Sequence, residues 1–203
     1  MNDQKKYPHI NLMPYQWEPF NGDTHLQDTF IKLRDKHGIK KAIELGTCLG
    51  STTIFLAENF EQVYSTEISP EFYAIADARL IDRNLWNVAL YCEDSRSILD
   101  AILPHDEPAI VFIDSHWGAN NPLIQELEII RKFGNRKLVL VIHDFKVPDH
   151  PELQFDTYPA QNIVYEWAWI EKSVERIYPD GYTKRYNETA TGAKVGVIII
   201  EPK

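Results

Sequence analysis

The stretch IELGTCLGST, residues 43–52, joins a short apolar run to two glycines and then to hydroxyl side chains. The run ends at Leu45, and Gly46 and Gly50 follow it, four positions apart. A glycine-rich turn between a parallel strand and its helix leaves backbone N–H groups free and lets a ligand approach the main chain closely. The stretch therefore predicts a strand–turn–helix corner that binds a ligand.

From residue 40 onward, short runs of β-strand character alternate with helical patterns, as they do in α/β proteins with a mostly parallel sheet. Two of the runs are almost wholly apolar, which is typical of strands covered on both faces. The tail, residues 182–202, has two strand-like halves joined by a Thr/Gly turn, and it predicts an antiparallel hairpin at the sheet edge. The runs before the tail occupy residues 40–45, 62–67, 87–92, 109–114 and 137–143, and the last two of these are the almost wholly apolar ones.

Helix signals lie between these runs. A capping serine, a proline and an acid at 69–71 predict a helix start, and Asn-Pro at 121–122 predicts another. An earlier helix is expected over 24–37. The segment 145–160 carries three prolines and little periodicity, so we expect a long loop there. The apolar spacing of Ile163, Val164, Trp167 and Ile170 predicts that the next helix contains all four residues.

Length and composition favour one domain over residues 1–203, with an N-terminal cap segment and helix at 1–38 and the sheet-containing core at 39–203. Lys and Arg total 21 against 30 Asp and Glu, a net charge of -9, which argues against broad nucleic-acid or anionic-membrane surfaces. The apolar stretches are too short to span a bilayer. The two cysteines lack paired spacing, so we expect a reducing, cytoplasmic location. A homo-oligomer is compatible with the sequence.

An acid at the end of the second predicted strand points to a nucleoside ligand. Glu67 lies 17 residues after Gly50, where a carboxylate can accept hydrogen bonds from both ribose hydroxyls of an adenosine. Such an acid serves dinucleotides and adenosyl sulfonium cofactors alike. Cys48 occupies the position of the middle glycine of the dinucleotide fingerprint, which favours the sulfonium class. Asp94, after the third strand, is expected near the adenine edge, as a helix N-cap, or both.

Together these residues resemble class I S-adenosylmethionine-dependent methyltransferases, over residues 40 to about 145. ELGTCLGST is similar to the E-L-G-x-x-x-G-x-S/T stretch of the catechol and macrocin type small-molecule O-methyltransferases. The resemblance implies a Rossmann-like methyltransferase fold, with a seven-stranded, mostly parallel sheet, helices on both faces and an antiparallel last strand. It implies that S-adenosylmethionine is held by Glu44, Gly46, Thr47, Gly50, Ser51, Thr52, Glu67, Ile68, Asp94, Ser95 and Asp114.

Acid and histidine side chains follow the fourth and fifth predicted strands, in Asp114-Ser115-His116 and His143-Asp144. Ligands collect outside the carboxyl ends of parallel strands. Asp114, His143 and Asp144 are therefore expected to hold a divalent cation, with carboxylates suiting Mg²⁺ and imidazole tilting the site toward transition metals.

In the metal-dependent members of the family, two acids or an acid and an amide follow the fifth strand, so His143 either replaces an acid or is simply adjacent to the site. The lysine of catechol-type enzymes is replaced by Trp117. His116 is then the predicted base, and Asp114, His116 and His143 are the predicted catalytic residues.

These residues predict a methyltransferase that acts on a small hydroxyl-bearing molecule with assistance from a divalent cation. Three alternatives stay open: a metal-independent O- or N-methyltransferase with a histidine base, a nicotinamide-dependent oxidoreductase, and a nucleoside-binding module without catalysis. The segment 14–20 and the loop 145–160 can close the site. Their aromatic residues, which are candidates for its apolar walls, are Tyr15, Trp17, Phe155 and Tyr158.

Overall fold

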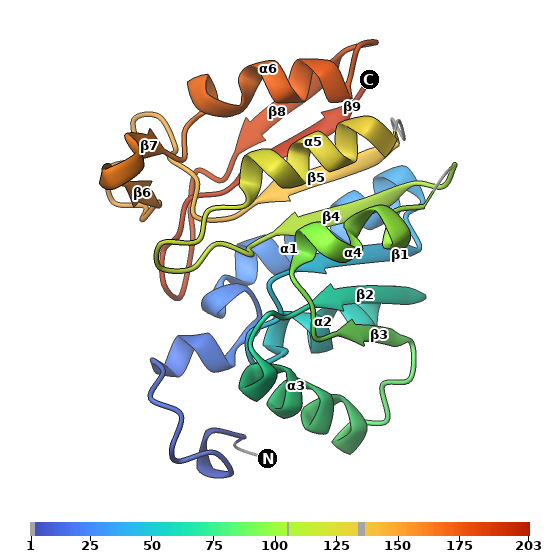
Figure 1. Ribbon diagram of the computed structural model, residues 1–203, viewed down its shortest axis with the longest axis vertical. Helices are drawn as coiled ribbons and strands as arrows, with labels where there is room; N and C mark the ends of the chain where they lie inside the picture. Colours follow the sequence, from blue (N-terminus) through green and yellow to red (C-terminus); the bar gives the residue numbers. More distant parts are fainter. Residues whose placement is uncertain (1–2, 105, 134–136) are drawn as a thin grey trace.

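A seven-stranded sheet forms the centre of the computed structural model, which describes residues 3–104, 106–133 and 137–203 (Figure 1). The strand order is β3-β2-β1-β4-β5-β9-β8. The first five strands are parallel, and β9 runs antiparallel to both of its neighbours. The predicted seven strands and C-terminal hairpin are therefore confirmed. The strands are β1 (Lys41–Leu45), β2 (Gln62–Thr66), β3 (Val88–Tyr91), β4 (Ala109–Ile113), β5 (Leu138–Ile142), β8 (Tyr182–Tyr186) and β9 (Ile198–Pro202).

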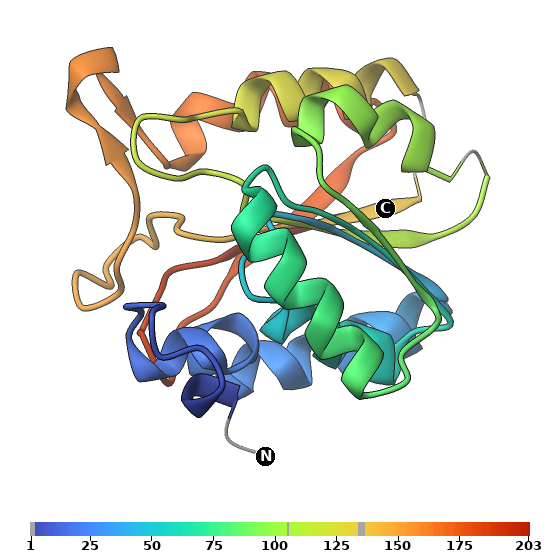
Figure 2. The same cartoon turned by 60° about the horizontal axis from the view of Figure 1, so that its bottom comes forward.

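Helices cover both faces of the sheet, with α1, α2 and α3 on one side and α4, α5 and α6 on the other (Figure 2). Alternate side chains of a strand point to opposite faces. In β1, Ile43 and Leu45 pack into the core under α4–α6, whereas Ala42 packs under α1 and α2. The helices are α1 (Thr24–His37), α2 (Ser51–Asn59), α3 (Pro70–Asp82), α4 (Ser95–Ile102), α5 (Leu123–Phe133) and α6 (Trp167–Ile177). None of the described helices is long and apolar enough to cross a membrane.

Local capping sets the ends of the predicted helices. The Asp23 side chain accepts hydrogen bonds from two backbone N–H groups at the start of α1, and Gly38 ends this helix with a φ of 62°. Ser69 caps α3 in the same way, with a proline at the first helical position. The expected helix over 24–37 and the start at 69–71 are both confirmed.

The predicted start of the last helix was wrong. Ile163 and Val164 form β7 (Ile163–Val164), which pairs antiparallel with β6 (Thr157–Tyr158), and α6 begins only at Trp167. Asn162, with a φ of 54°, makes the left-handed turn between the two strands. The apolar spacing of these residues was compatible with either structure, because a short apolar run does not separate a strand from a helix start.

The N-terminal segment packs against the glycine turn. Trp17 is buried against Leu49, which lies in the turn, and Ile75 of α3. The backbone N–H of Phe20 donates a hydrogen bond of 2.9 Å to Oγ1 of Thr52 at the start of α2. The segment thus lies beside the carboxyl ends of the parallel strands. Its short 3-10 helices are η1 (Asp3–Lys5), η2 (Pro14–Trp17) and η3 (Pro19–Gly22), and η4 (Pro159–Gln161) lies between β6 and β7.

Candidate active site

A cleft of about 360 Å³ opens at the carboxyl ends of the parallel strands. This is the place where open α/β sheets bind ligands. The predicted residues that line it are Gly46, Glu67, Ile68, Asp94, Ser95, Asp114, His116 and Asp144. Predicted residues that lie outside its lining are Glu44, Thr47, Gly50, Ser51, Thr52 and His143.

At the glycine turn, the ends of β1 and β4 lie so close together that a side chain at position 46 has no room. Gly46 has a φ of 98°, and a Cβ atom there would lie 2.2 Å from the carbonyl oxygen of Asp114. The turn was expected to leave its N–H groups free, and this was wrong for most of them. The N–H groups of Gly46 and Thr47 both donate to the carbonyl of Thr66, and that of Cys48 donates to the Glu67 carboxylate. The turn therefore offers close approach to its backbone rather than a set of free donors.

Glu67, directly after β2, is held at the cleft by backbone donors. Its Oε2 accepts from the N–H of Cys48 at 2.7 Å, and its Oε1 accepts from the N–H of Ser69 at 2.8 Å. The side chain is mostly buried, and burial raises the pKa of its carboxyl group. A carboxylate has about four acceptor positions, so both oxygens keep capacity for a bound hydroxyl.

Several predicted residues support the turn from below. Glu44 is fully buried, and its Oε2 accepts hydrogen bonds of 2.5 Å from the hydroxyls of Thr53 and Ser65. Its Oε1 has no hydrogen-bond partner among the described residues. Burial raises the pKa of Glu44 to about 8. The Thr47 hydroxyl is also hydrogen-bonded to that of Ser65, at 2.5 Å. Glu44 and Thr47 thus shape the turn and do not border the cleft.

Two further predicted hydroxyls at the start of α2 are used inside the protein. The Ser51 hydroxyl accepts a hydrogen bond of 3.1 Å from the guanidinium of Arg79. The Thr52 hydroxyl accepts from the N-terminal segment, as described above. Gly50 precedes them in a left-handed conformation, with the side chain of Ala76 close by. These three residues fix the entry into α2.

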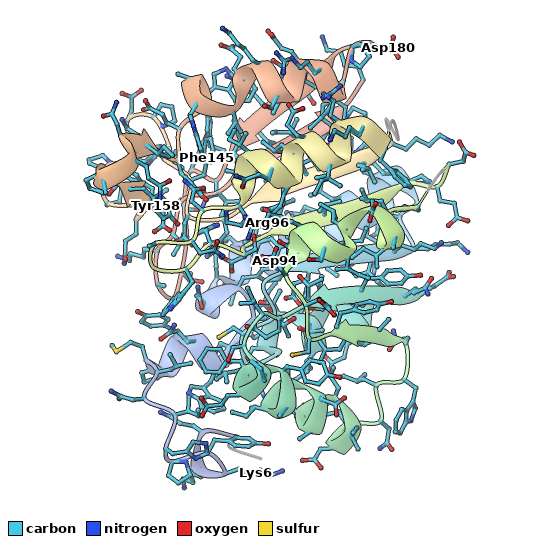
Figure 3. All side chains as sticks on the ribbon, viewed as in Figure 1. Lys6, Asp94, Arg96, Phe145, Tyr158 and Asp180 are labelled. Atoms are coloured by element: carbon cyan, nitrogen blue, oxygen red, sulfur yellow. The ribbon has the colours of Figure 1, made fainter. Side chains whose placement is uncertain are left out.

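The cleft ends on one side at the start of α4, where Figure 3 shows Asp94 and Arg96 side by side. Oδ1 of Asp94 accepts from the backbone N–H of Arg96 at 2.9 Å, which caps the helix, and the carboxylate also pairs with the guanidinium. The hydrogen bond with Arg96 lowers the pKa of Asp94. Asp94 therefore caps α4, as one of its two predictions states, and it also lines the cleft.

A buried acid that the sequence did not single out lies behind this end of the cleft. Glu126 in α5 is fully buried, and its Oε1 accepts from the hydroxyls of Ser95 and Ser115. Burial raises the pKa of Glu126. Because Ser95 follows β3 and Ser115 follows β4, this carboxyl group ties two walls of the cleft together. In the sequence, Glu126 is an acid in an amphipathic helix pattern, and no feature of that pattern distinguishes it from a solvent-exposed acid.

Two histidines and three carboxylates converge at the opposite end, after β4 and β5. Nε2 of His116 lies 3.0 Å from Oδ2 of Asp144 and 3.8 Å from Oδ1 of Asp114. Nδ1 of His143 lies 3.2 Å from Oδ2 of Asp144 and 3.4 Å from Oδ1 of Asp114. Asp156, from the loop after β5, places its Oδ2 3.8 Å from Nε2 of His116. No pattern in the sequence pointed to Asp156, because only the folded loop brings it here.

The charges in this cluster change the protonation of its members. Burial lowers the pKa of His116, but the hydrogen bond to Asp144 and the nearby carboxylate charges outweigh burial and raise it. Burial also lowers the pKa of His143, but the charges of Asp114 and Asp144 outweigh burial and raise this pKa well above its usual value, with the Asp114 charge contributing most. Burial opposes ionisation of Asp144, yet the charge of His143 and the two histidine hydrogen bonds hold its pKa far below the usual range.

The remaining wall comes from the N-terminal segment and the turn after β4. Leu12, Gln16 and Asn21 line the cleft, together with Trp117 and Asn120. Trp117 is 74% exposed, so its ring stands at the mouth. The aromatic residues proposed as walls, Tyr15, Trp17, Phe155 and Tyr158, are not among the lining residues.

Comparison with known proteins bears on the fold. No protein-family model matches the sequence, and no curated protein matches it. Among solved structures, the O-methyltransferase TomG from Streptomyces achromogenes, involved in tomaymycin synthesis and bound to S-adenosylmethionine, is 16% identical with a TM-score of 0.62, over 100% of this chain and 86% of TomG. The O-methyltransferase from Bacillus cereus bound to S-adenosylhomocysteine is 18% identical with a TM-score of 0.62, over 100% of this chain and 87% of that one. The chain therefore has the Rossmann-like methyltransferase fold that its sequence predicts.

Proposed function

We propose that the protein is an S-adenosylmethionine-dependent methyltransferase that acts on a hydroxyl group of a small molecule, with a divalent cation assisting. The observation that carries this proposal is the pairing of Gly46 with Glu67 across one cleft at the carboxyl ends of β1 and β2. A backbone that a ligand can approach closely, opposite a fixed carboxylate, suits an adenosine ribose followed by a charged tail. The fold shared with TomG and the Bacillus cereus enzyme supports the same conclusion.

Each part of the cofactor has suitable residues along the cleft. The Glu67 carboxylate would accept the ribose hydroxyls, since its backbone hydrogen bonds hold it in place. Ile68 is 60% exposed and offers an apolar surface to the adenine ring, with Asp94 and Ser95 beyond it. Gly46 and Asp114 border the end where the methionine part would lie. Methyl transfer is an in-line displacement, so the main task of these residues is alignment.

Asp114, His143 and Asp144 fit a divalent cation. Their donor atoms all lie within 4.8 Å of one another, and two carboxylates with an imidazole are common ligands of such ions. A bound cation would lower the pKa of the acceptor hydroxyl and fix its oxygen. The chain's own part is to keep these donors buried or half-buried at the end of the cleft, next to the position proposed for the methyl group.

The metal-independent alternative assigns proton removal to a histidine. His116 is the candidate base, because its Nε2 faces the cleft end and its pKa is raised. In that version Asp144 and Asp114 would stabilise the imidazolium that forms. Activity that persists unchanged in a strong chelator would select this alternative over metal assistance.

Isothermal titration with S-adenosylmethionine and S-adenosylhomocysteine tests the proposal. We expect both to bind, and Glu67→Ala to weaken binding by about 10- to 100-fold, because hydrogen bonds to a charged group are lost. Glu61→Ala is the matched control, since Glu61 precedes β2 at its other end and forms an exposed ion pair with Lys40. Heat from NAD but from neither adenosyl compound would instead select an oxidoreductase.

A further inference from the structure

We infer that the cluster after β4 and β5 is a five-donor centre for one first-row transition metal ion, in which His116 and Asp156 act as ligands beside Asp114, His143 and Asp144. This inference deepens the metal assistance in the proposed function. It replaces the role of His116 as a base, and it assigns a role to Asp156, which belongs to the loop between β5 and β6. It also names the class of ion.

The histidine–carboxylate distances in the cluster fit one coordination shell. Ligand atoms about 2.1 Å from a metal ion lie roughly 3 Å apart when adjacent and about 4 Å apart when opposite. The measured separations are 3.0, 3.2, 3.4, 3.8 and 3.8 Å, between the two imidazole nitrogens and the three carboxylates. Nε2 of His116 is as close to the Asp144 carboxylate as Nδ1 of His143 is, at 3.0 Å against 3.2 Å. Asp144 belongs to both sets of three donor atoms that lie within 4.8 Å of one another, Asp114–His143–Asp144 and His116–Asp144–Asp156, so an ion bound to Asp144 would lie close to both sets.

The surroundings leave the carboxylates in need of a cation. Asp114, Asp144 and Asp156 lie close together, and in the described part of the chain neither a lysine nor an arginine forms an ion pair with them. Their ion-pair partners there are the two imidazoles, each less than a tenth exposed. Buried or half-buried carboxylates of like charge are costly unless paired or metal-bound. Each histidine directs one nitrogen into this group, which is the arrangement of a ligand.

Backbone hydrogen bonds bring Asp156 to the cluster. Its N–H donates to the carbonyl of Asp144 at 2.9 Å, and its carbonyl accepts from the N–H of Tyr165 at 3.1 Å. The Tyr158 hydroxyl donates a hydrogen bond of 3.1 Å to Oδ2 of Asp156. Tyr158 is the last residue of β6, and it is labelled in Figure 3. The loop is thus pinned to the end of β5 with its carboxylate turned toward His116.

The donor types select the ion. Carboxylates alone suit Mg²⁺, Ca²⁺ or Mn²⁺, whereas imidazole nitrogen suits the later transition metals. Two imidazoles with three carboxylates therefore favour ions such as Mn²⁺, Fe²⁺ or Co²⁺ over Mg²⁺. Mg²⁺ also keeps several waters and binds few protein ligands, which does not suit a crowded set of five.

Metal titration of the full chain, first stripped with chelator and in the absence of any methyl donor, tests this inference. Calorimetry should give Mn²⁺ and Co²⁺ affinities at least about tenfold above that of Mg²⁺, with one ion per chain. X-ray absorption of the Co²⁺-loaded protein should report two imidazole ligands. Affinity for Co²⁺ should fall at least about tenfold in His116→Ala and Asp156→Asn.

The controls come from the same loop. His150→Ala and Asp149→Asn change residues outside the cluster, His150 being paired with Glu152, and should bind Co²⁺ like the unaltered protein. One imidazole in the absorption spectrum, equal Mg²⁺ and Co²⁺ affinities, or unchanged Co²⁺ binding in both cluster variants would overturn the inference. The spectrum of the unaltered protein decides the matter even if a variant fails to fold. S-adenosylmethionine binding is measured in a separate titration. A failure to bind it would count against the proposed function and not against the metal centre.

Discussion

Replacing Gly46 by alanine should damage both the fold and the cofactor site. The new Cβ would lie 2.2 Å from the carbonyl oxygen and 2.7 Å from the carbonyl carbon of Asp114, which is backbone and cannot rotate away. The φ of 98° adds conformational strain. We estimate about 1–3 kcal/mol for the strain and a further 1–3 kcal/mol for the overpacking. A loss of about 4 kcal/mol should lower the melting temperature by about 8–16 °C.

Gly38→Ala is the matched control for this substitution. Gly38 also has a positive φ, of 62°, but a Cβ there would meet no atom within 4 Å. Its replacement should cost only the left-handed strain, about 1–2 kcal/mol. Both substitutions reduce the entropy of the unfolded chain equally, so the difference between them isolates the clash.

Thermal unfolding followed by circular dichroism, with calorimetric titration of S-adenosylmethionine, measures both effects. Gly46→Ala should unfold well below Gly38→Ala and lose cofactor binding, while Gly38→Ala keeps it. Equal melting temperatures for the two variants would refute the argument that β1 and β4 leave no room at this turn. Cofactor binding retained by Gly46→Ala would refute the proposed use of the close backbone approach.

Two other predictions concern buried or capping acids. The folded-state pKa of Glu44 is raised to about 8, so between about pH 4.5 and pH 8 the folded protein keeps a proton that the unfolded chain releases. The free energy of unfolding should therefore fall as the pH rises through this range, by up to about 5 kcal/mol in total. Glu44→Gln should remove this dependence in urea unfolding measured at several pH values, and identical pH profiles would contradict it. Asp94→Ala should cost about 1 kcal/mol through loss of the α4 cap, whereas Asp94→Asn keeps the cap and should cost less; equal losses in urea unfolding would count against the cap.

Much of the fold follows from local patterns in the sequence. Apolar runs, helix caps and the glycine turn each act over a few residues, so β1 to β5 and the starts of α1 and α3 were predictable. The start of α6 was not, because the β6–β7 hairpin and a helix both accommodate Ile163 and Val164. The hairpin wins through pairing with Thr157 and Tyr158, a contact that no local pattern reveals.

The candidate site was predictable only in part. Asp114, His116 and Asp144 follow strands, and the parallel sheet brings strand ends to one edge. Asp156 and Glu126 belong to a loop and a helix, and tertiary packing alone gives them their partners. The orientation of Glu44 could have been inferred from strand alternation, since Ile43 and Leu45 on either side point to the opposite face. The Glu44 side chain points to the hydroxyls of Thr53 and Ser65, on the face away from Ile43 and Leu45.

The most direct test of the proposed function is a crystal structure of the protein soaked with S-adenosylhomocysteine. The ribose hydroxyl oxygens should lie about 2.6–3.0 Å from the carboxylate oxygens of Glu67, with the homocysteine part beside Gly46. Density for the compound elsewhere on the surface, or a ribose that does not contact Glu67, would contradict the assignment of this cleft to an adenosyl cofactor.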